Sequence, residues 1–195
     1  MELDNERLNS KNTASSKKSA PKDKQGILAY LHDIVCLVAG VVLLFSLCFR
    51  IVVVSGPSMN NTLIDGDWLL LAGSVFYGQP QQGDVIVASK DSFDNGKPII
   101  KRVIATEGQH VIIDFKSGAI SVDGQLLEEN HMMLYPDGEY HVFAEHHVLN
   151  NSFNAIVPKG HVFLMGDNRN ESLDSRSTRI GLVDERFILG EVKVR

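Results

Sequence analysis

The stretch Ile99-Ile100-Lys101-Arg102-Val103-Ile104-Ala105 contains five apolar residues out of seven, interrupted by two adjacent cations. A nearly continuous apolar run of this length is typical of a strand that is buried on both faces or at a contact between sheets. Lysine is almost never buried without a cause. Successive strand residues point to opposite faces, so either Lys101 or Arg102 faces inward or both lie at a rim. An edge strand protected by its charges is the alternative interpretation.

Outward from this stretch, further short runs of β-branched and aromatic residues alternate with turn residues such as Gly66-Asp67 and Asn95-Gly96. This spacing is typical of strands joined by hairpins. The runs are IVVV at 51, WLLLA at 68, DVIVAS at 84, HVIIDF at 110, AISVD at 119, HVFLMG at 161 and GEVKVR at 190. The sequence therefore predicts a mainly β fold of coiled antiparallel sheets. The more polar stretch at about 113–156 is expected to form a small appended lobe.

A long apolar segment precedes the predicted strands. Residues 34–49 carry no charge, and extending the segment back to Ile27 gives 23 residues, about 35 Å of helix, which is enough to cross a bilayer. A cleaved signal sequence is the alternative, but no small-x-small site closes the run, where Phe49 and Arg50 stand instead. We expect a retained transmembrane anchor over residues 27–49.

The first 26 residues are polar, rich in Asn, Ser and Ala, and have no hydrophobic period. This composition predicts a disordered tail. Its basic residues outnumber those at the far end of the anchor, so the positive-inside rule predicts a cytoplasmic tail and an extracytoplasmic domain over residues 50–195.

Charge and cysteine content narrow the choice of partners. The chain has 19 basic and 24 acidic side chains, of which the tail contributes six and four, so residues 27–195 carry a net charge of −7 with His neutral. A nucleic-acid partner is not expected for such an acidic domain. Both cysteines, Cys36 and Cys48, fall inside the apolar segment, so a disulfide framework is not expected either.

Ser58 lies just beyond the anchor and follows Gly56-Pro57, a pair that lets the chain turn sharply and present the hydroxyl on a loop. An ordinary turn serine is the alternative. At the usual lysine pKa, only about one amine in 2,500 is neutral at pH 7, and burial lowers that pKa by several units. Ser58 as nucleophile and a buried Lys101 as its base are therefore a consistent hypothesis.

The segment 165–176 follows the apolar run HVFLM and is dense in Asp, Arg, Asn and Ser. Two interpretations are open for this segment: a solvated loop, or an interlocked network of hydrogen bonds and ion pairs. Its repeated Asp, Arg and Ser residues favour the network.

Five ordered motifs together resemble bacterial type I signal peptidases, the leader peptidases of the serine-lysine protease class. The resemblance covers roughly residues 30–112 and 157–192. The motifs are Gly56-Pro57-Ser58-Met59 with Thr62-Leu63, Gly66-Asp67, Gly83-Asp84-Val85, Lys101-Arg102-Val103-Ile104, and Gly166-Asp167-Asn168-Arg169 with Ser172 and Asp174-Ser175-Arg176.

The resemblance implies a membrane-bound endopeptidase that removes signal peptides from exported preproteins after small-x-small sites. Ser58 would attack the scissile carbonyl, and Lys101 would act as general base and then general acid. Ser172 would orient the lysine ammonium, while a salt bridge between Asp174 and Arg176 would support the loop. The substrate pocket would be formed by Val52, Val54, Met59, Leu63, Leu69, Ile99 and Ile100.

The same resemblance implies a monomer in the bacterial cytoplasmic membrane that needs no metal or cofactor. Its partners would be preproteins and the lipid bilayer. The Ser58 backbone N–H would serve the oxyanion hole, where some relatives add a hydroxyl at the position of Gly56. This chain also has Asn61 where the family usually has proline, and the loss of that φ-fixing ring could loosen the nucleophile loop.

Three other readings compete with this one. One is a Ser-His-Asp hydrolase, which is disfavoured because the sequence has no G-x-S-x-G motif. A metal site at His131 or His146-His147 is disfavoured as well, because no further ligands stand at suitable spacing. Self-cleaving repressors use a Ser-Lys pair but carry a soluble DNA-binding half in place of the anchor. The remaining alternative is a non-cleaving homologue that assists surface-protein or pilus assembly.

Overall fold

The computed structural model describes residues 22–60, 62–73, 76–90, 93, 96–128 and 152–194, which fall into two compact units divided between Val42 and Leu43. One α-helix, α1, runs over Lys22–Cys48, and its segment Gly26–Cys48 is long and apolar enough to cross a membrane. The helix ends one residue before the expected end of the anchor, because Phe49 begins a strand. Residues 22–26 of the expected tail are helical, and residues 1–21 lie outside the described part of the chain.

The larger sheet has seven strands in the order β1-β2-β11-β3-β4-β9-β10, and every neighbouring pair is antiparallel. Its strands are β1 (Phe49–Val53), β2 (Trp68–Gly73), β3 (Val85–Ala88), β4 (Ile99–Ala105), β9 (His161–Met165), β10 (Val183–Asp184) and β11 (Ile188–Val194). The strand β4 lies between β3 and β9, so it is an interior strand. The edge-strand alternative for this stretch is therefore wrong.

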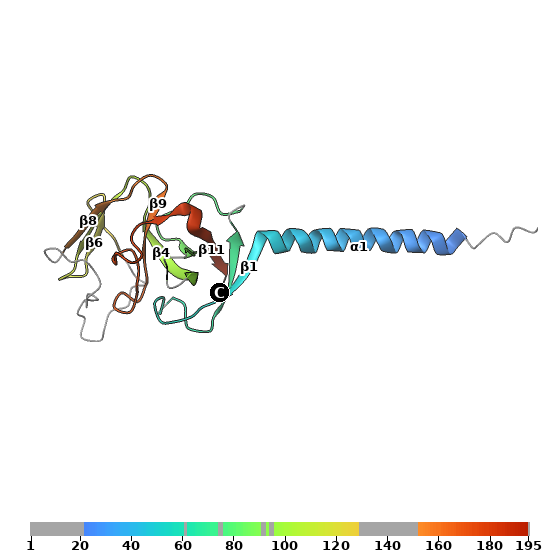
Figure 1. The fold of residues 1–195 in the computed structure, drawn as a ribbon, viewed down its shortest axis with the longest axis horizontal. Helices are drawn as coiled ribbons and strands as arrows, with labels where there is room; N and C mark the ends of the chain where they lie inside the picture. The colour runs from blue at the N-terminus through green and yellow to red at the C-terminus, as the bar shows by residue number, and fades with distance from the viewer. Residues whose placement is uncertain are drawn as a thin grey trace, which may run out of the picture. The chain divides into compact units, whose positions relative to one another are not determined.

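The smaller sheet has the order β7-β6-β5-β8, again with antiparallel pairs. Its strands are β5 (His110–Asp114), β6 (Ile120–Val122), β7 (Gln125–Leu126) and β8 (Ser152–Ile156). In Figure 1, β6 and β8 lie at one end of the unit Leu43–Arg195, and β1 and β11 lie at its other end. Four of the histidines in the polar stretch, His131, His141, His146 and His147, lie outside the described residues.

Three apolar clusters hold the sheets together. One joins β5 and β6 to β4 and β9 through residues such as Val111 and Phe163; a second packs around Ile86 and Val103; a third lies under the nucleophile loop around Met59 and Leu71. The mainly β prediction is confirmed, and all eight apolar runs became strands. The short strands β7, β8 and β10 were not foreseen, because two-residue ladders and a strand as polar as Ser152–Ile156 carry little hydrophobic pattern.

Candidate active site

The loop after β1 is shaped by backbone hydrogen bonds that place Ser58 at a turn. Val54 and Gly66-Asp67 pair across the base of the loop, with Val54 N to Asp67 O at 2.9 Å and Gly66 N to Val54 O at 3.0 Å. Gly56 adopts a φ of +94°, which residues with a Cβ rarely adopt, and its N–H donates to the Asp65 carboxylate at 2.8 Å. Pro57 O accepts from Asn60 N at 2.9 Å. The Gly-Pro pair thus closes a defined turn at Ser58.

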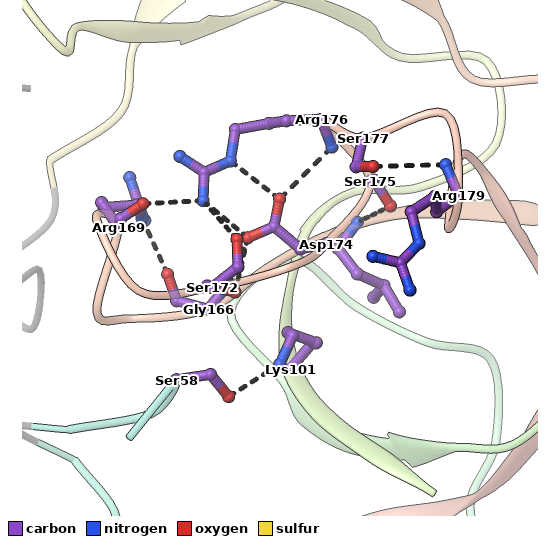
Figure 2. A network of polar contacts seen from close by, with 11 residues as sticks. Ser58, Lys101, Gly166, Arg169, Ser172, Asp174, Ser175, Arg176, Ser177 and Arg179 are labelled. Atoms are coloured by element: carbon purple, nitrogen blue, oxygen red, sulfur yellow. Dashed lines mark hydrogen bonds and ion pairs between the residues drawn. The ribbon is translucent and has the colours of Figure 1, made fainter. Parts of the chain in front are cut away.

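Ser58 and Lys101 meet at this turn (Figure 2). The Lys101 Nζ donates to Ser58 Oγ at 2.7 Å and to its neighbouring carbonyl, Ile100 O, at 3.0 Å. The lysine is only 4% exposed. Burial is the main cause that lowers the pKa of Lys101, to about 8, against the opposing attraction of Asp174. The sequence-predicted pair is therefore assembled in a hydrogen-bonded and desolvated form.

Arg102 points to the other face of β4, as strand alternation requires. Its guanidinium makes a bidentate contact with Asp167, from Nε to Oδ1 at 2.8 Å and from Nη2 to Oδ2 at 2.7 Å, and a further hydrogen bond to Gly83 O at 2.7 Å. Asp167 is fully buried. The two adjacent cations of the strand therefore face different surroundings. Arg102 is held in an ion pair, whereas Lys101 contacts a hydroxyl and a carbonyl oxygen.

The loop after β9 is a closed polar network around Asp174, drawn in Figure 2. Asp174 Oδ1 accepts from Arg176 Nε at 2.7 Å, and Oδ2 accepts from Arg176 Nη2 at 2.8 Å and from Gly166 N at 3.0 Å. Burial raises the pKa of Asp174, but the charge and hydrogen bonds of Arg176 outweigh it and hold that pKa at about 2. The segment is the interlocked network rather than a solvated loop.

Ser172 belongs to this network. Its hydroxyl donates to Asp174 Oδ2 at 2.7 Å, and its carbonyl accepts from Arg176 Nη2 at 3.3 Å. Gly166 brings Ser172 and Ser58 close together, because a Cβ at Gly166 would overlap Ser172 Oγ and Ser58 O. A glycine is required at this position by close approach and not by a turn.

The same loop also holds the nucleophile segment directly. Asn168 N donates to Ser58 O at 3.1 Å, and Asn168 Nδ2 donates to Pro57 O at 3.2 Å. The Thr62 hydroxyl donates to Asp167, which ties the segment after Ser58 to the same loop. Sequence reasoning did not assign a role to Asn168, Asp167 or Thr62, although all three lie within motifs that carry the family resemblance. Asn61, next to Thr62, lies outside the described residues.

A cavity of about 400 Å³ opens beside the dyad, and Ser58 and Lys101 both line it. Five of the seven pocket residues expected from the sequence line it as well: Val52, Val54, Met59, Ile99 and Ile100. Leu63 and Leu69, 3% and 1% exposed, pack instead in the apolar cluster under the nucleophile loop. Sequence reasoning did not name the further lining residues Val53, Ser55, Lys97, Pro98, Leu173 and Ile180.

Residues 27–195 match the family model described as signal peptidase, peptidase S26. The chain belongs to this signal peptidase family. The match covers the candidate anchor and the whole β domain, and it confirms the resemblance read from the motifs. Membership makes the chain an enzyme of the signal-peptide-processing type.

Several signal peptidases are similar over most of their length. The chain is 29% identical to signal peptidase I of Bacillus licheniformis, covering 90% of this chain and 91% of that protein. It is 32% identical to signal peptidase I P of Bacillus subtilis subsp. natto, with 90% and 91% covered. It is 35% identical to a probable signal peptidase I-1 of Synechocystis, with 73% and 68% covered.

Among solved structures, a signal peptidase I from Enterococcus faecalis matches with a TM-score of 0.44 and 26% identity, covering 60% of this chain and 99% of that one.

Proposed function

We propose that this chain removes N-terminal signal peptides from exported preproteins by a Ser58/Lys101 dyad, cutting after small-x-small sites. The observation that supports the dyad best is the 2.7 Å hydrogen bond between Lys101 Nζ and Ser58 Oγ at a lysine that is almost fully buried. With a pKa near 8, about one Lys101 amine in ten is neutral at pH 7, roughly 250-fold more than for a free lysine.

In the proposed reaction, Ser58 Oγ forms a bond to the scissile carbonyl carbon while its proton passes to the neutral Lys101 amine. The tetrahedral intermediate then collapses, the C–N bond breaks, and the Lys101 ammonium gives its proton to the leaving amine. Water attacks the resulting ester, with Lys101 again taking the proton; the bond between Ser58 Oγ and the acyl carbon then breaks, Lys101 returns the proton to Ser58 Oγ, and the cleaved signal peptide leaves with a free carboxyl group.

The oxyanion of the intermediate would be stabilised by the Ser58 backbone N–H, a donor type whose removal costs about 10²- to 10³-fold in rate in other hydrolases. Asn168 supports this geometry because it fixes Ser58 and Pro57 through their carbonyls. Ser172 would orient the protonated Lys101 from the loop after β9, and the ion pair between Asp174 and Arg176 would keep that loop in place.

The apolar cavity suits small apolar side chains before the cut, with the substrate extended between β1 and β4. The helix α1 would serve as a single membrane anchor. The basic tail favours a cytoplasmic N-terminus and a catalytic domain, residues 50–195, on the outer side of the cytoplasmic membrane. Exported preproteins would meet the site there, and we propose that the enzyme works as a monomer.

Cleavage of a preprotein with an Ala-x-Ala site by the detergent-solubilised protein tests this function, with mass analysis of the products. Wild type and Ser117→Ala, a control at an exposed serine of the smaller sheet, should cut after the last Ala. Ser58→Ala and Lys101→Ala should not.

Two results would count against the proposal. A wild type that binds the preprotein without cutting it would favour the assembly-assisting alternative. Full activity in Lys101→Ala would leave a peptidase but end the dyad mechanism.

A further inference from the structure

The strand directions in the larger sheet determine on which side of Ser58 and Lys101 the cavity extends. Successive antiparallel pairings from β1 through β2, β11 and β3 to β4 make β1 and β4 run the same way. Two segments supply most of the cavity lining, residues 52–59 and 97–101, and each ends at or next to Ser58 or Lys101; Leu173 and Ile180 complete the lining. The cavity therefore extends to one side of Ser58 and Lys101, along the residues that precede them.

The proposed function decides which part of a substrate lies in this cavity, and the present inference rests on it. The lining is mostly apolar and suits the small side chains that precede the cut. The signal-peptide side of the scissile bond therefore occupies the cavity, and the substrate extends away from the dyad toward Val52 and Lys97.

Lys97 is the lining residue of the segment 97–101 that is farthest along the chain from Lys101. It precedes Pro98, which biases its backbone toward an extended conformation, and it is four residues before Lys101. At about 3.3 Å per extended residue, the separation along the strand is about 13 Å. An extended substrate covers the same distance in about four residues, so Lys97 faces the fourth or fifth residue before the cut.

Lys97 is also electrostatically distinct. Among the described residues that line the cavity, the only charged types are Lys97 and Lys101, and there is no carboxylate. Lys101 must be neutral to act as a base. Lys97 is exposed and forms no ion pair with any residue that the structure describes. It is thus the one permanent charge on this described lining, in a domain whose net charge is negative.

We propose that Lys97 is a specificity-determining residue that favours preproteins with an acidic side chain four or five positions before the cleavage site and disfavours those with a basic one. The attraction acts in ground-state binding, so it appears in KM rather than in kcat. It is an exposed interaction and therefore modest and salt-dependent.

The test uses two sets of preproteins that differ only in having Glu, Gln or Lys at the fourth or at the fifth position before an Ala-x-Ala cut. For wild type at low salt, kcat/KM for Glu should exceed that for Lys by about threefold or more at one of the two positions. The preference should shrink in 0.5 M salt, invert in Lys97→Glu and vanish in Lys97→Gln. Lys159→Glu, which makes the same charge change at an exposed lysine before β9, should keep the wild-type ratio.

Equal rates for Glu and Lys at both positions in wild type would overturn the proposal, as would a preference that persists in Lys97→Gln. The same preference can be measured without cleavage, as the ratio of Kd values for the Glu and Lys preproteins, with each Lys97 substitution combined with Ser58→Ala. Absence of cleavage by wild type would therefore defeat the proposed function, while the binding ratios would still decide the role of Lys97.

Discussion

Lys101 and Asp174 are two ionisable groups buried in one site, with exposures of 4% and 0%, yet their surroundings differ. Asp174 accepts hydrogen bonds from Arg176, Ser172 and Gly166 N, and its pKa stays low although burial opposes ionisation. Lys101 contacts a hydroxyl and a carbonyl and forms no ion pair with the described residues, so burial lowers its pKa to about 8. A compensated buried charge stays ionised and supports structure, whereas an uncompensated one becomes available for proton transfer.

Replacing Lys101 by methionine sharpens this contrast most, because activity and stability should move in opposite directions. Cleavage should fall by more than about 10³-fold, as for the loss of a catalytic base. The free energy of unfolding at pH 7 should rise by about 1–3 kcal/mol, since an apolar side chain of similar length avoids the cost of burying an amine.

The sign of the stability change follows from the lowered pKa. The folded protein holds the Lys101 proton less tightly than the unfolded chain, whose ordinary value is 10.5. The cost is therefore complete below about pH 8 and disappears as the pH rises past 10.5. Thermal unfolding in detergent at pH 7 and at pH 10.5 measures it. A methionine variant that is less stable than wild type at pH 7 would show that Lys101 is structurally compensated after all.

Replacing Asp174 by asparagine tests the other half of the comparison. It leaves Arg176, 2% exposed, as a buried cation without its carboxylate, and we expect a loss of about 3–5 kcal/mol in unfolding free energy. Asp184→Asn is the matched control, because its partner Arg186 is 84% exposed and such pairs contribute less than about 1 kcal/mol. Denaturant titration measures both. Similar losses in the two variants would mean that the Asp174 network is no more than a surface pair.

The sequence was sufficient to predict that Ser58 and Lys101, the two groups of the proposed dyad, would lie together. A lysine inside an apolar strand is an exception to a local rule and is readable without coordinates, and Ser58 stood out only through the Gly-Pro-Ser-Met motif and its place in the family pattern. The strand that carries Lys101 was also predictable, because interior strands have continuous apolar runs.

The connections between the groups were not predictable in the same way. Asn168 reaches Pro57 across 111 positions of sequence, and no periodicity links residues so far apart. The core placement of Leu63 and Leu69 depends on their packing with residues distant in the sequence, such as Val87 and Ile100. The Ser172 hydroxyl donates to Asp174, a partner that composition alone does not identify.

The pH dependence of cleavage tests the comparison with the smallest change, since no residue is altered. In the proposed mechanism neutral Lys101 is the active form, so kcat/KM should rise about tenfold per pH unit below its pKa and level off above about pH 8. Asp174, with its pKa near 2, stays ionised over this range, so its titration does not affect the rate. A plot of log(kcat/KM) against pH should therefore keep a slope of one between pH 5 and 7. Initial rates on an Ala-x-Ala preprotein give the profile, and thermal unfolding over the same range excludes loss of fold as the cause. A slope of two would mean that a second group must also lose a proton, and that the division between a titrating lysine and a permanently charged aspartate does not hold.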